Sequence, residues 1–175
     1  MKLDELDGRI GEGFGGVSPN GAHLNVVLAK RGSPTAAAAV SMLAHPSPGH
    51  TPVLVVTGPT QQEYEPIFPP TLMMNKATAL DEHLQTMTWG AAQLGIAQGV
   101  LDAVAEGLVE ATQELVVLVA VWVDAAADDE TALRLAARDG MLKAIRVAVT
   151  GRDPGAVQAL VDRRDTLRSP FYGGT

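Results

Sequence analysis

The chain has 175 residues, of which 46% are hydrophobic and 19% charged, and this is the composition of an ordinary globular protein. Its formal net charge of −7 opposes broad attraction to nucleic acid or to an anionic membrane surface, because both require a basic stripe that the sequence lacks. The absence of cysteine excludes disulfides and thiolate chemistry. We therefore expect one domain whose partner is a small molecule or another protein.

No segment of the sequence predicts membrane insertion or export. The longest apolar run, residues 115–123, is far shorter than the roughly 20 residues that a helix needs to cross a bilayer. The N-terminal residues 1–7 are acidic and contain no apolar signal core. These features predict a soluble, cytoplasmic protein.

The first predicted elements are a glycine-dense segment, residues 8–21, and a strand at residues 22–30. Side chains alternate along a strand, so one face of residues 22–30 is uniformly apolar and is expected to lie in the core. The opposite face carries His23 and Asn25 as neighbours. These two polar groups either meet water or line a pocket, and the alternation alone favours neither.

A helix is predicted next, from residue 34 to about residue 44, because Ser33 can cap its free N–H groups and proline fits its first position. A second buried strand is predicted at residues 53–56. A proline-punctuated loop follows at residues 58–70, and it leads to a third strand at residues 71–78.

The longest helix is predicted over residues 79–106. Thr78 and Asp81 lie three residues apart at its start, close to a capping box, and Gly107 is well placed to end it. The apolar spacing predicts one buried stripe. That stripe comprises Leu84, Met87, Ala91, Leu94, Leu101 and Val104.

The last part of the chain contains a strand and two helices. Residues 114–123 lack alternation, which is typical of a central strand covered on both faces. Acidic residues 128–130 suit the start of a helix that reaches about Val149, and Asp153 with Pro154 opens a shorter one. The order is strand, strand, helix, strand, strand, helix, strand, helix, helix. It predicts a two-layer α+β domain with helices packed on a mixed sheet.

Residues 11–16 formally fit the dinucleotide-binding pattern G-x-G-x-x-G. A functional copy needs a strand before it and a helix after it, whereas here Pro19 and another strand follow. We therefore interpret these residues as turn glycines. Paired Cys or His ligands and the H-E-x-x-H motif are missing, so no metal is expected.

Three of the four histidines are predicted to be ordinary surface residues. His45 and His50 flank a Pro-Ser-Pro-Gly turn, where exposure to solvent is expected. His83 lies in the first turn of an amphipathic helix and is also expected at the surface. His23 differs, because it lies beside Asn25 in a strand that ends shortly before a helix. This placement raises the case for a site, but the pattern alone does not decide between a site and an ordinary polar position.

Three further polar residues allow a simple structural interpretation. Lys76 is typical of a strand end that reaches solvent, and Thr78 of a helix cap. Gln93 lies in a helix beside small residues and is typical of a buried amide bonded to the backbone. From their pattern alone, none of the three needs a function.

Several blocks, in order and with matching separations, resemble the formaldehyde-activating enzyme family. They are IGE (10–12), AHLN (22–25), RGSP (31–34), HTPVL (50–54), TLMMNKAT (71–78), GAAQ (90–93), DAVAEGL (102–108) and SPF (169–171). The resemblance covers about residues 10–150 and the tail. The loop at residues 61–70 is longer than in the family pattern.

The resemblance implies a cytoplasmic homopentamer that condenses formaldehyde with tetrahydromethanopterin, its co-substrate, to the methylene adduct and water, without a metal or redox cofactor. It implies an α+β fold like domain two of a small-subunit ribosomal protein. The family's catalytic acid falls on His23. Its substrate contacts fall on Asn25, Leu54, Lys76, Thr78 and Gln93. The resemblance also divides the chain into a catalytic domain at residues 1–150 and a C-terminal helix and tail at residues 151–175, packed on or near it.

Asn25 departs from the family pattern, which has aspartate at this position. Asparagine keeps the shape but loses the charge, so a contact with a charged partner worth roughly 1.5–3 kcal/mol falls toward about 0.5–1.5 kcal/mol. Two alternatives therefore stay open. The chain is a relative that acts on a different aldehyde or amine, or a non-catalytic protein that binds the pterin or the aldehyde.

Overall fold

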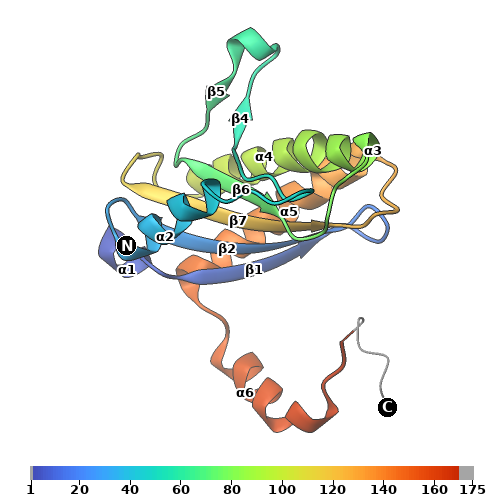
Figure 1. Ribbon diagram of the computed structural model, residues 1–175. Helices are drawn as coiled ribbons and strands as arrows, with labels where there is room; N and C mark the ends of the chain where they lie inside the picture. Colours follow the sequence, from blue (N-terminus) through green and yellow to red (C-terminus); the bar gives the residue numbers. More distant parts are fainter. Residues whose placement is uncertain (1, 170–175) are drawn as a thin grey trace.

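A mixed five-stranded sheet forms the centre of the fold, in the strand order β1-β2-β7-β6-β3 (Figure 1). The computed structural model describes residues 2–169, without the side chains of residues 42 and 43. Strands β6 and β7 are parallel, and the other pairs are antiparallel. The strands are β1 Ile10–Gly15, β2 Ala22–Lys30, β3 Val53–Leu54, β6 Thr71–Asn75 and β7 Leu115–Val123. The predicted mixed sheet, with residues 115–123 at its centre, is confirmed.

Helices cover one face of this sheet. The two longest, α4 Gln93–Ala105 and α5 Glu130–Thr150, lie against the same side, which we call the covered face (Figure 1). The remaining helices are α1 Leu3–Leu6, α2 Pro34–Leu43, α3 Glu82–Gln85, the π-helix η2 Thr86–Ala92 and α6 Pro154–Asp162, with short 3₁₀ turns η1 Gln61–Glu63 and η3 Arg164–Thr166. The two-layer α+β prediction is therefore confirmed. No described helix is long and apolar enough to cross a membrane.

The glycines of β1 let a helix touch the strand backbone. A Cβ atom on Gly13 would lie 2.0 Å from the Gly140 carbonyl oxygen of α5, and Gly11 and Gly15 are equally close to other α5 carbonyls. The interpretation of residues 11–16 as turn glycines is therefore wrong for these three, which lie inside a strand. It holds for Gly16, where φ is +71°.

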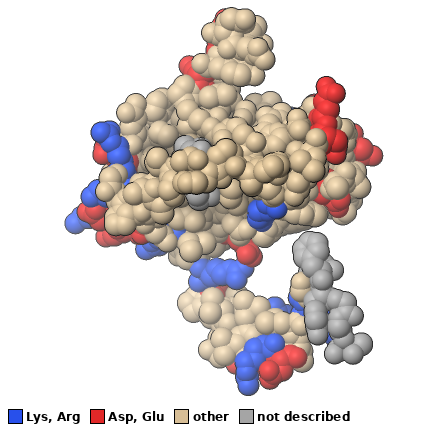
Figure 2. All heavy atoms as spheres, viewed as in Figure 1, with Lys and Arg blue, Asp and Glu red and all other residues tan. Residues whose placement is uncertain are grey.

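The other side of the sheet, which we call the open face, is left half-exposed. Residues of β2 and β7 alternate between fully buried and half-buried positions, as predicted for residues 22–30. The prediction that residues 114–123 form a strand covered on both faces is therefore wrong within this chain, because β7 is fully covered on one face only. The open face carries Ile10, Glu12, Phe14, His23, Asn25, Val27, Leu72, Met74, Leu118, Ala120 and Trp122. In the view of Figure 2 the main body is largely uncharged, and charged side chains gather at its ends and on the C-terminal helix.

The predicted helix at residues 79–106 is continuous from Glu82, but its second part is π-helical. A π segment adds one residue to the turn, so every later position rotates relative to the α-helical pattern. Leu94 and Leu101 are therefore 40% and 45% exposed, against the prediction of a buried stripe, and Ile96 and Val100 are buried instead. The predicted stop at Gly107 is confirmed by its φ of +71°.

The edge of the sheet beyond β6 is less regular than predicted. The predicted strand at residues 53–56 divides into β3 and a separate strand, β4 Val56–Thr57, and β6 ends at Asn75 rather than at residue 78. The predicted loop contains β5 Glu65–Pro66, which pairs with β4. Figure 1 shows this hairpin projecting from the body of the fold.

The C-terminal helices follow the sequence prediction. Helix α5 ends at Thr150, and Asp153 caps α6 through the Ala156 amide. Figure 1 shows α6 below the sheet, and none of its residues is buried. Its packing on residues 1–150 stays a prediction, and the family block at residues 169–171 lies largely outside the described residues.

Candidate active site

Three polar side chains meet on the open face. The Lys76 Nζ lies 2.7 Å from the His23 Nδ1 and donates a hydrogen bond of 2.8 Å to the Asn25 Oδ1. His23 and Asn25 come from one face of β2, and Lys76 follows the end of β6. We call these three residues the polar cluster. His23 and Asn25 therefore meet another polar side chain and do not simply face water.

The strand between β2 and β6 makes this contact possible. Ala120 of β7 lies between Asn25 and Met74 in register, so only a methyl group stands between these two positions of the open face. The Lys76 amide donates to the Val121 carbonyl at 2.7 Å, which holds its backbone against β7. The interpretation of Lys76 as a strand end reaching solvent is therefore wrong, because the side chain is half-buried and bonded.

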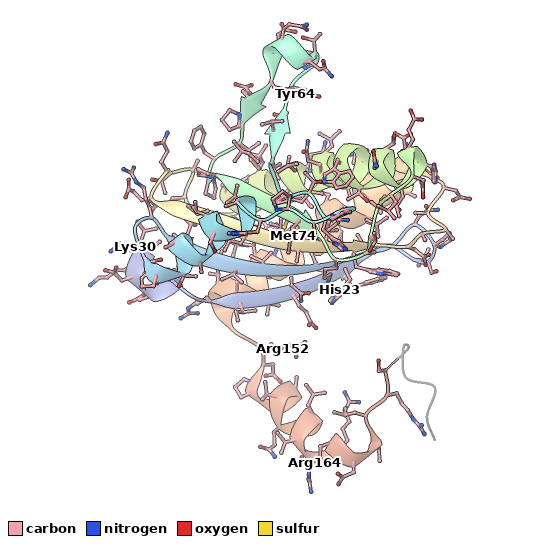
Figure 3. The ribbon with its side chains drawn as sticks, in the orientation of Figure 1. His23, Lys30, Tyr64, Met74, Arg152 and Arg164 are labelled. Atoms are coloured by element: carbon pink, nitrogen blue, oxygen red, sulfur yellow. The ribbon has the colours of Figure 1, made fainter. Side chains whose placement is uncertain are left out.

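The contact with Lys76 determines which nitrogen of His23 carries the proton. An ammonium group can only donate, so a charged Lys76 makes Nδ1 the acceptor and places the proton of the neutral imidazole on Nε2. Within residues 2–169, Nε2 has no hydrogen-bond partner. Figure 3 shows His23 on β2 at the side of the sheet away from α4 and α5. The imidazole can therefore offer an N–H group to a bound molecule.

One carboxylate faces the polar cluster. Glu12 of β1 is opposite Asn25 in register, and it pairs with Arg152 at 2.6 Å between Oε1 and Nη2. Burial lowers the pKa of His23 below its ordinary value of 6.5, and the Lys76 ammonium lowers it further, while Glu12 opposes both effects. Burial also lowers the pKa of Lys76 from 10.5, again opposed by Glu12.

An apolar hollow of about 150 Å³ adjoins the cluster, between the open face and helix α2. Asn25 is its polar boundary, and Met74, labelled in Figure 3, lies in its wall. The other lining residues are Val27, Ala39, Pro52, Leu72, Met73, Leu118, Val119 and Ala120. Such a hollow suits the flat, mostly apolar part of a small molecule whose polar edge meets the cluster.

The remaining predicted site residues surround the cluster without joining it. Leu54 is opposite Leu72 in register, so its exposed side chain is on the open face. Thr78 accepts or donates one hydrogen bond, at 3.0 Å to the His50 Nε2. Gln93 of α4 donates to the Val56 carbonyl at 3.2 Å, which is the backbone-bonded amide predicted from its pattern.

Two interpretations are corrected here. Asp81, and not Thr78, caps the long helix, through a 2.7 Å bond from the Leu84 amide. His50 is half-buried rather than exposed, because its Nδ1 also bonds to the Asn75 carbonyl at 3.0 Å. His45 and His83 are exposed as predicted.

Sequence reasoning missed Glu12 as a member of the site. The alternation of glycines with Ile10, Glu12 and Phe14 is a period-two pattern that could have placed Glu12 on the same face as Asn25. Among the described residues no group of three or more His, Cys, Asp or Glu side chains could hold a metal ion. The prediction of a metal-free site stays a prediction.

The cluster combines a proton donor, a cation and an amide beside an apolar hollow. This arrangement can hold a polar heterocycle and protonate a leaving group at its edge. It offers His23 as the donor, since Nε2–H has no other partner among the residues that the structure describes. The polar cluster provides both hydrogen-bond donors and hydrogen-bond acceptors, because the Asn25 side chain can donate and accept.

Comparison with known proteins gives a consistent set of matches. The family model described as formaldehyde-activating enzyme matches residues 10–172. The 5,6,7,8-tetrahydromethanopterin hydro-lyase of Methanosarcina barkeri is 32% identical over 168 residues, covering 95% of this chain and 91% of that protein. The bifunctional enzyme Fae/Hps of Archaeoglobus fulgidus is 34% identical over 120 residues, covering 67% of this chain and 29% of that protein. The Fae/Hps protein of Methanothrix thermoacetophila is 32% identical, with 71% and 31% covered. The chain thus spans less than a third of either bifunctional relative.

Proposed function

Because the chain belongs to the formaldehyde-activating enzyme family, we propose that it condenses formaldehyde with tetrahydromethanopterin to the methylene adduct and water. The polar cluster beside the apolar hollow is the observation that carries this proposal. The M. barkeri relative supports it, because that protein is named a hydro-lyase of this pterin and is matched over nearly its whole length.

The chemistry explains why a histidine is needed. A secondary amine adds readily to formaldehyde, but the hydroxymethyl intermediate must then lose hydroxide, which leaves poorly unless it is protonated. The Nε2–H of His23 is the proposed donor, and a placed acid of this kind contributes about 10²- to 10⁴-fold. The resulting iminium is trapped by the second amine of the pterin, and holding both reactants in one site supplies the rest.

The substrate contacts of the proposal are Asn25, Leu54, Lys76, Thr78 and Gln93. Asn25 and Lys76 already meet His23, and Leu54 shares their face, which supports their part in one site. Thr78 and Gln93 bond elsewhere in the isolated chain. Their inclusion rests on the family resemblance.

Three more detailed parts of the proposal rest on family membership. These are a homopentameric assembly, a cytoplasmic location and a likeness of the fold to domain two of a small-subunit ribosomal protein. The half-exposed apolar residues of the open face and the projecting β4–β5 hairpin support an assembly, because neither is covered within one chain. Sedimentation of the purified protein tests the assembly directly.

The function is tested by the rate at which methylene adduct forms from formaldehyde and tetrahydromethanopterin, measured against the spontaneous rate. We expect saturable acceleration by the wild type and a loss of about 10²- to 10⁴-fold in His23→Ala. His83→Ala is the matched control, because that exposed imidazole binds the Ala127 carbonyl and lies outside the cluster. A folded His23→Ala protein as fast as the wild type contradicts the role of His23. Tetrahydrofolate in a parallel assay shows whether the neutral Asn25 changes the choice of pterin.

A further inference from the structure

The environment of His23 is poorly suited to an imidazolium. The Lys76 ammonium lies 2.7 Å from Nδ1, so a second positive charge on the ring would be repelled. Asn25, the other partner of Lys76, is neutral and offers no compensating charge. A neutral imidazole by itself is a much weaker acid than an imidazolium. The donor therefore needs a second source of protons.

We propose that Lys76 is this source, so that Lys76 and His23 form a proton relay in which Lys76 acts through His23 and not on the leaving group. The inference rests on the proposed function and deepens it. In these terms Lys76 is a positioning and proton-supplying residue, and His23 remains the group that touches the substrate.

Protons and electron pairs balance when the relay expels water from the hydroxymethyl intermediate. The C–O bond of the hydroxymethyl intermediate breaks, its electron pair goes to oxygen, and the amine lone pair forms the C=N bond of the iminium. The oxygen takes the proton from the His23 Nε2 and leaves as water. The Nδ1 takes a proton from the Lys76 ammonium across the 2.7 Å contact. His23 ends neutral with its proton on Nδ1, and Lys76 ends as a neutral amine.

The second half of the reaction resets the relay. When the second pterin amine attacks the iminium carbon, its nitrogen becomes positively charged and must lose a proton. The His23 Nε2, now unprotonated, accepts that proton, and Nδ1 returns its own to Lys76. No outside acid or base is consumed. This matches the overall condensation, which releases water and no net proton.

The surroundings of Lys76 make its ammonium group a stronger acid than a free lysine. Its ammonium is half-buried, and of its three protons one faces His23 and one Asn25. Burial lowers the pKa of Lys76 from 10.5, which brings the ammonium closer to a useful acid strength. The third proton stays available for a substrate contact.

Within the described part of the chain, few other charges face the relay. Glu12 is the carboxylate of β1 on this face, and its pairing with Arg152 at the start of the C-terminal segment limits its effect. The neighbouring positions of β7 are Ala120 and Trp122, whose side chains carry no titratable group. The hollow between α2 and the sheet is lined by apolar residues and Asn25. The pH dependence should therefore report Lys76 and His23, modulated by Glu12.

The relay and an imidazolium acid predict opposite pH profiles. The relay needs a neutral His23 and a charged Lys76, so kcat should fall on the acid side, below 6.5, as His23 gains a proton. The kcat should also fall on the alkaline side, as Lys76 loses its proton. The midpoint of that fall should lie below pH 10.5, because the pKa of Lys76 is lowered. An imidazolium acid would instead lose activity as the pH rises through the His23 pKa.

The experiment measures kcat and KM against pH for the wild type, Lys76→Met and Lys76→Arg. Both variants should lose about 10²-fold in kcat, because neither Met nor an always-charged guanidinium releases a proton. The alkaline limb should disappear with them. If Lys76 only contacts substrate, the variants raise KM and keep both kcat and the profile, and the relay is overturned.

A second measurement does not depend on activity. In ¹⁵N NMR of the folded wild type without substrate, the neutral His23 should carry its proton on Nε2, and its pKa should rise toward 6.5 in Lys76→Met. A proton on Nδ1, or an unchanged pKa, overturns the relay. If the His23→Ala protein is slow and the Lys76→Met protein is as fast as the wild type, the relay is contradicted and the catalytic role of His23 is kept. If His23→Ala is also fast, the catalytic role of His23 fails, and the proposed function itself fails only if the wild type gives no acceleration.

Discussion

The two faces of the sheet differ in packing and in polarity. On the covered face, glycines of β1 bring the strand backbone into contact with carbonyl groups of α5, and the contact leaves no room for a methyl group. On the open face, neighbouring positions of the same strands carry Glu12, His23 and Asn25, which are half-buried or exposed and meet other polar groups. One face provides stability through close packing, and the other keeps polar groups ready for a ligand.

The difference shows how one strand can serve both purposes. Because side chains alternate, β1 presents Gly11, Gly13 and Gly15 to the helix and Glu12 to the polar cluster. The tight fit on one side holds the strand in position, and this fixes the register that places Glu12 opposite Asn25. Changes on the covered face should therefore act on stability, and changes in the cluster on chemistry.

The largest effect is expected from Gly13→Ala. Its Cβ would lie 2.0 Å from the Gly140 carbonyl oxygen, so α5 must move away from the sheet, at a cost of about 3 kcal/mol or more in the free energy of unfolding. Gly90→Ala is the matched control, because its new methyl group would meet nothing closer than 4.0 Å. Urea unfolding measures both. A Gly13→Ala protein within about 1 kcal/mol of the wild type would contradict the close contact.

A smaller effect of opposite sign is expected from Lys76→Met. Burial lowers the pKa of Lys76, so the charged lysine opposes folding at neutral pH, and removing it should leave the free energy of unfolding unchanged or raise it by up to about 1 kcal/mol. The wild type should recover this difference as the pH rises through 10.5, because above that pH neither the folded nor the unfolded lysine keeps its proton.

Lys143→Met is the control for that comparison, because it removes an exposed ion pair with Asp139 and should change stability by about 0.5 kcal/mol or less. Thermal or urea unfolding at neutral and alkaline pH gives the values. If Lys76→Met lowers stability by more than about 1 kcal/mol, the cluster is a structural element and the contrast between the faces fails.

Local signals in the sequence predicted much of the fold. The alternation in residues 22–30 placed His23 and Asn25 on one face, and the caps at Ser33 and Gly107 bounded two helices correctly. The π segment escaped prediction, because a one-residue insertion in a helix leaves no clear local mark. The glycines of β1 were misinterpreted because their reason lies in α5, more than a hundred residues away in the chain.

The candidate site was only partly accessible from the residues. The pattern left His23 between solvent and a pocket, and it gave Lys76 and Thr78 simple structural roles. The meeting of Lys76 with His23 depends on the parallel pairing of β6 with β7 and the antiparallel pairing of β7 with β2, which no short pattern specifies. The family resemblance singled out the same residues, but the contact between Lys76 and His23 emerged only from the folded arrangement.

The central claim is that the pterin binds to the open face beside the polar cluster, and methyl NMR tests it most directly. Met74 lies in the wall of the apolar hollow, whereas Met141 is fully buried in the core under the covered face. On titration of ¹³C-methionine-labelled protein with tetrahydromethanopterin, the account predicts a saturable shift of the Met74 methyl signal and no shift of Met141. A shift of Met141 without one of Met74 would contradict it.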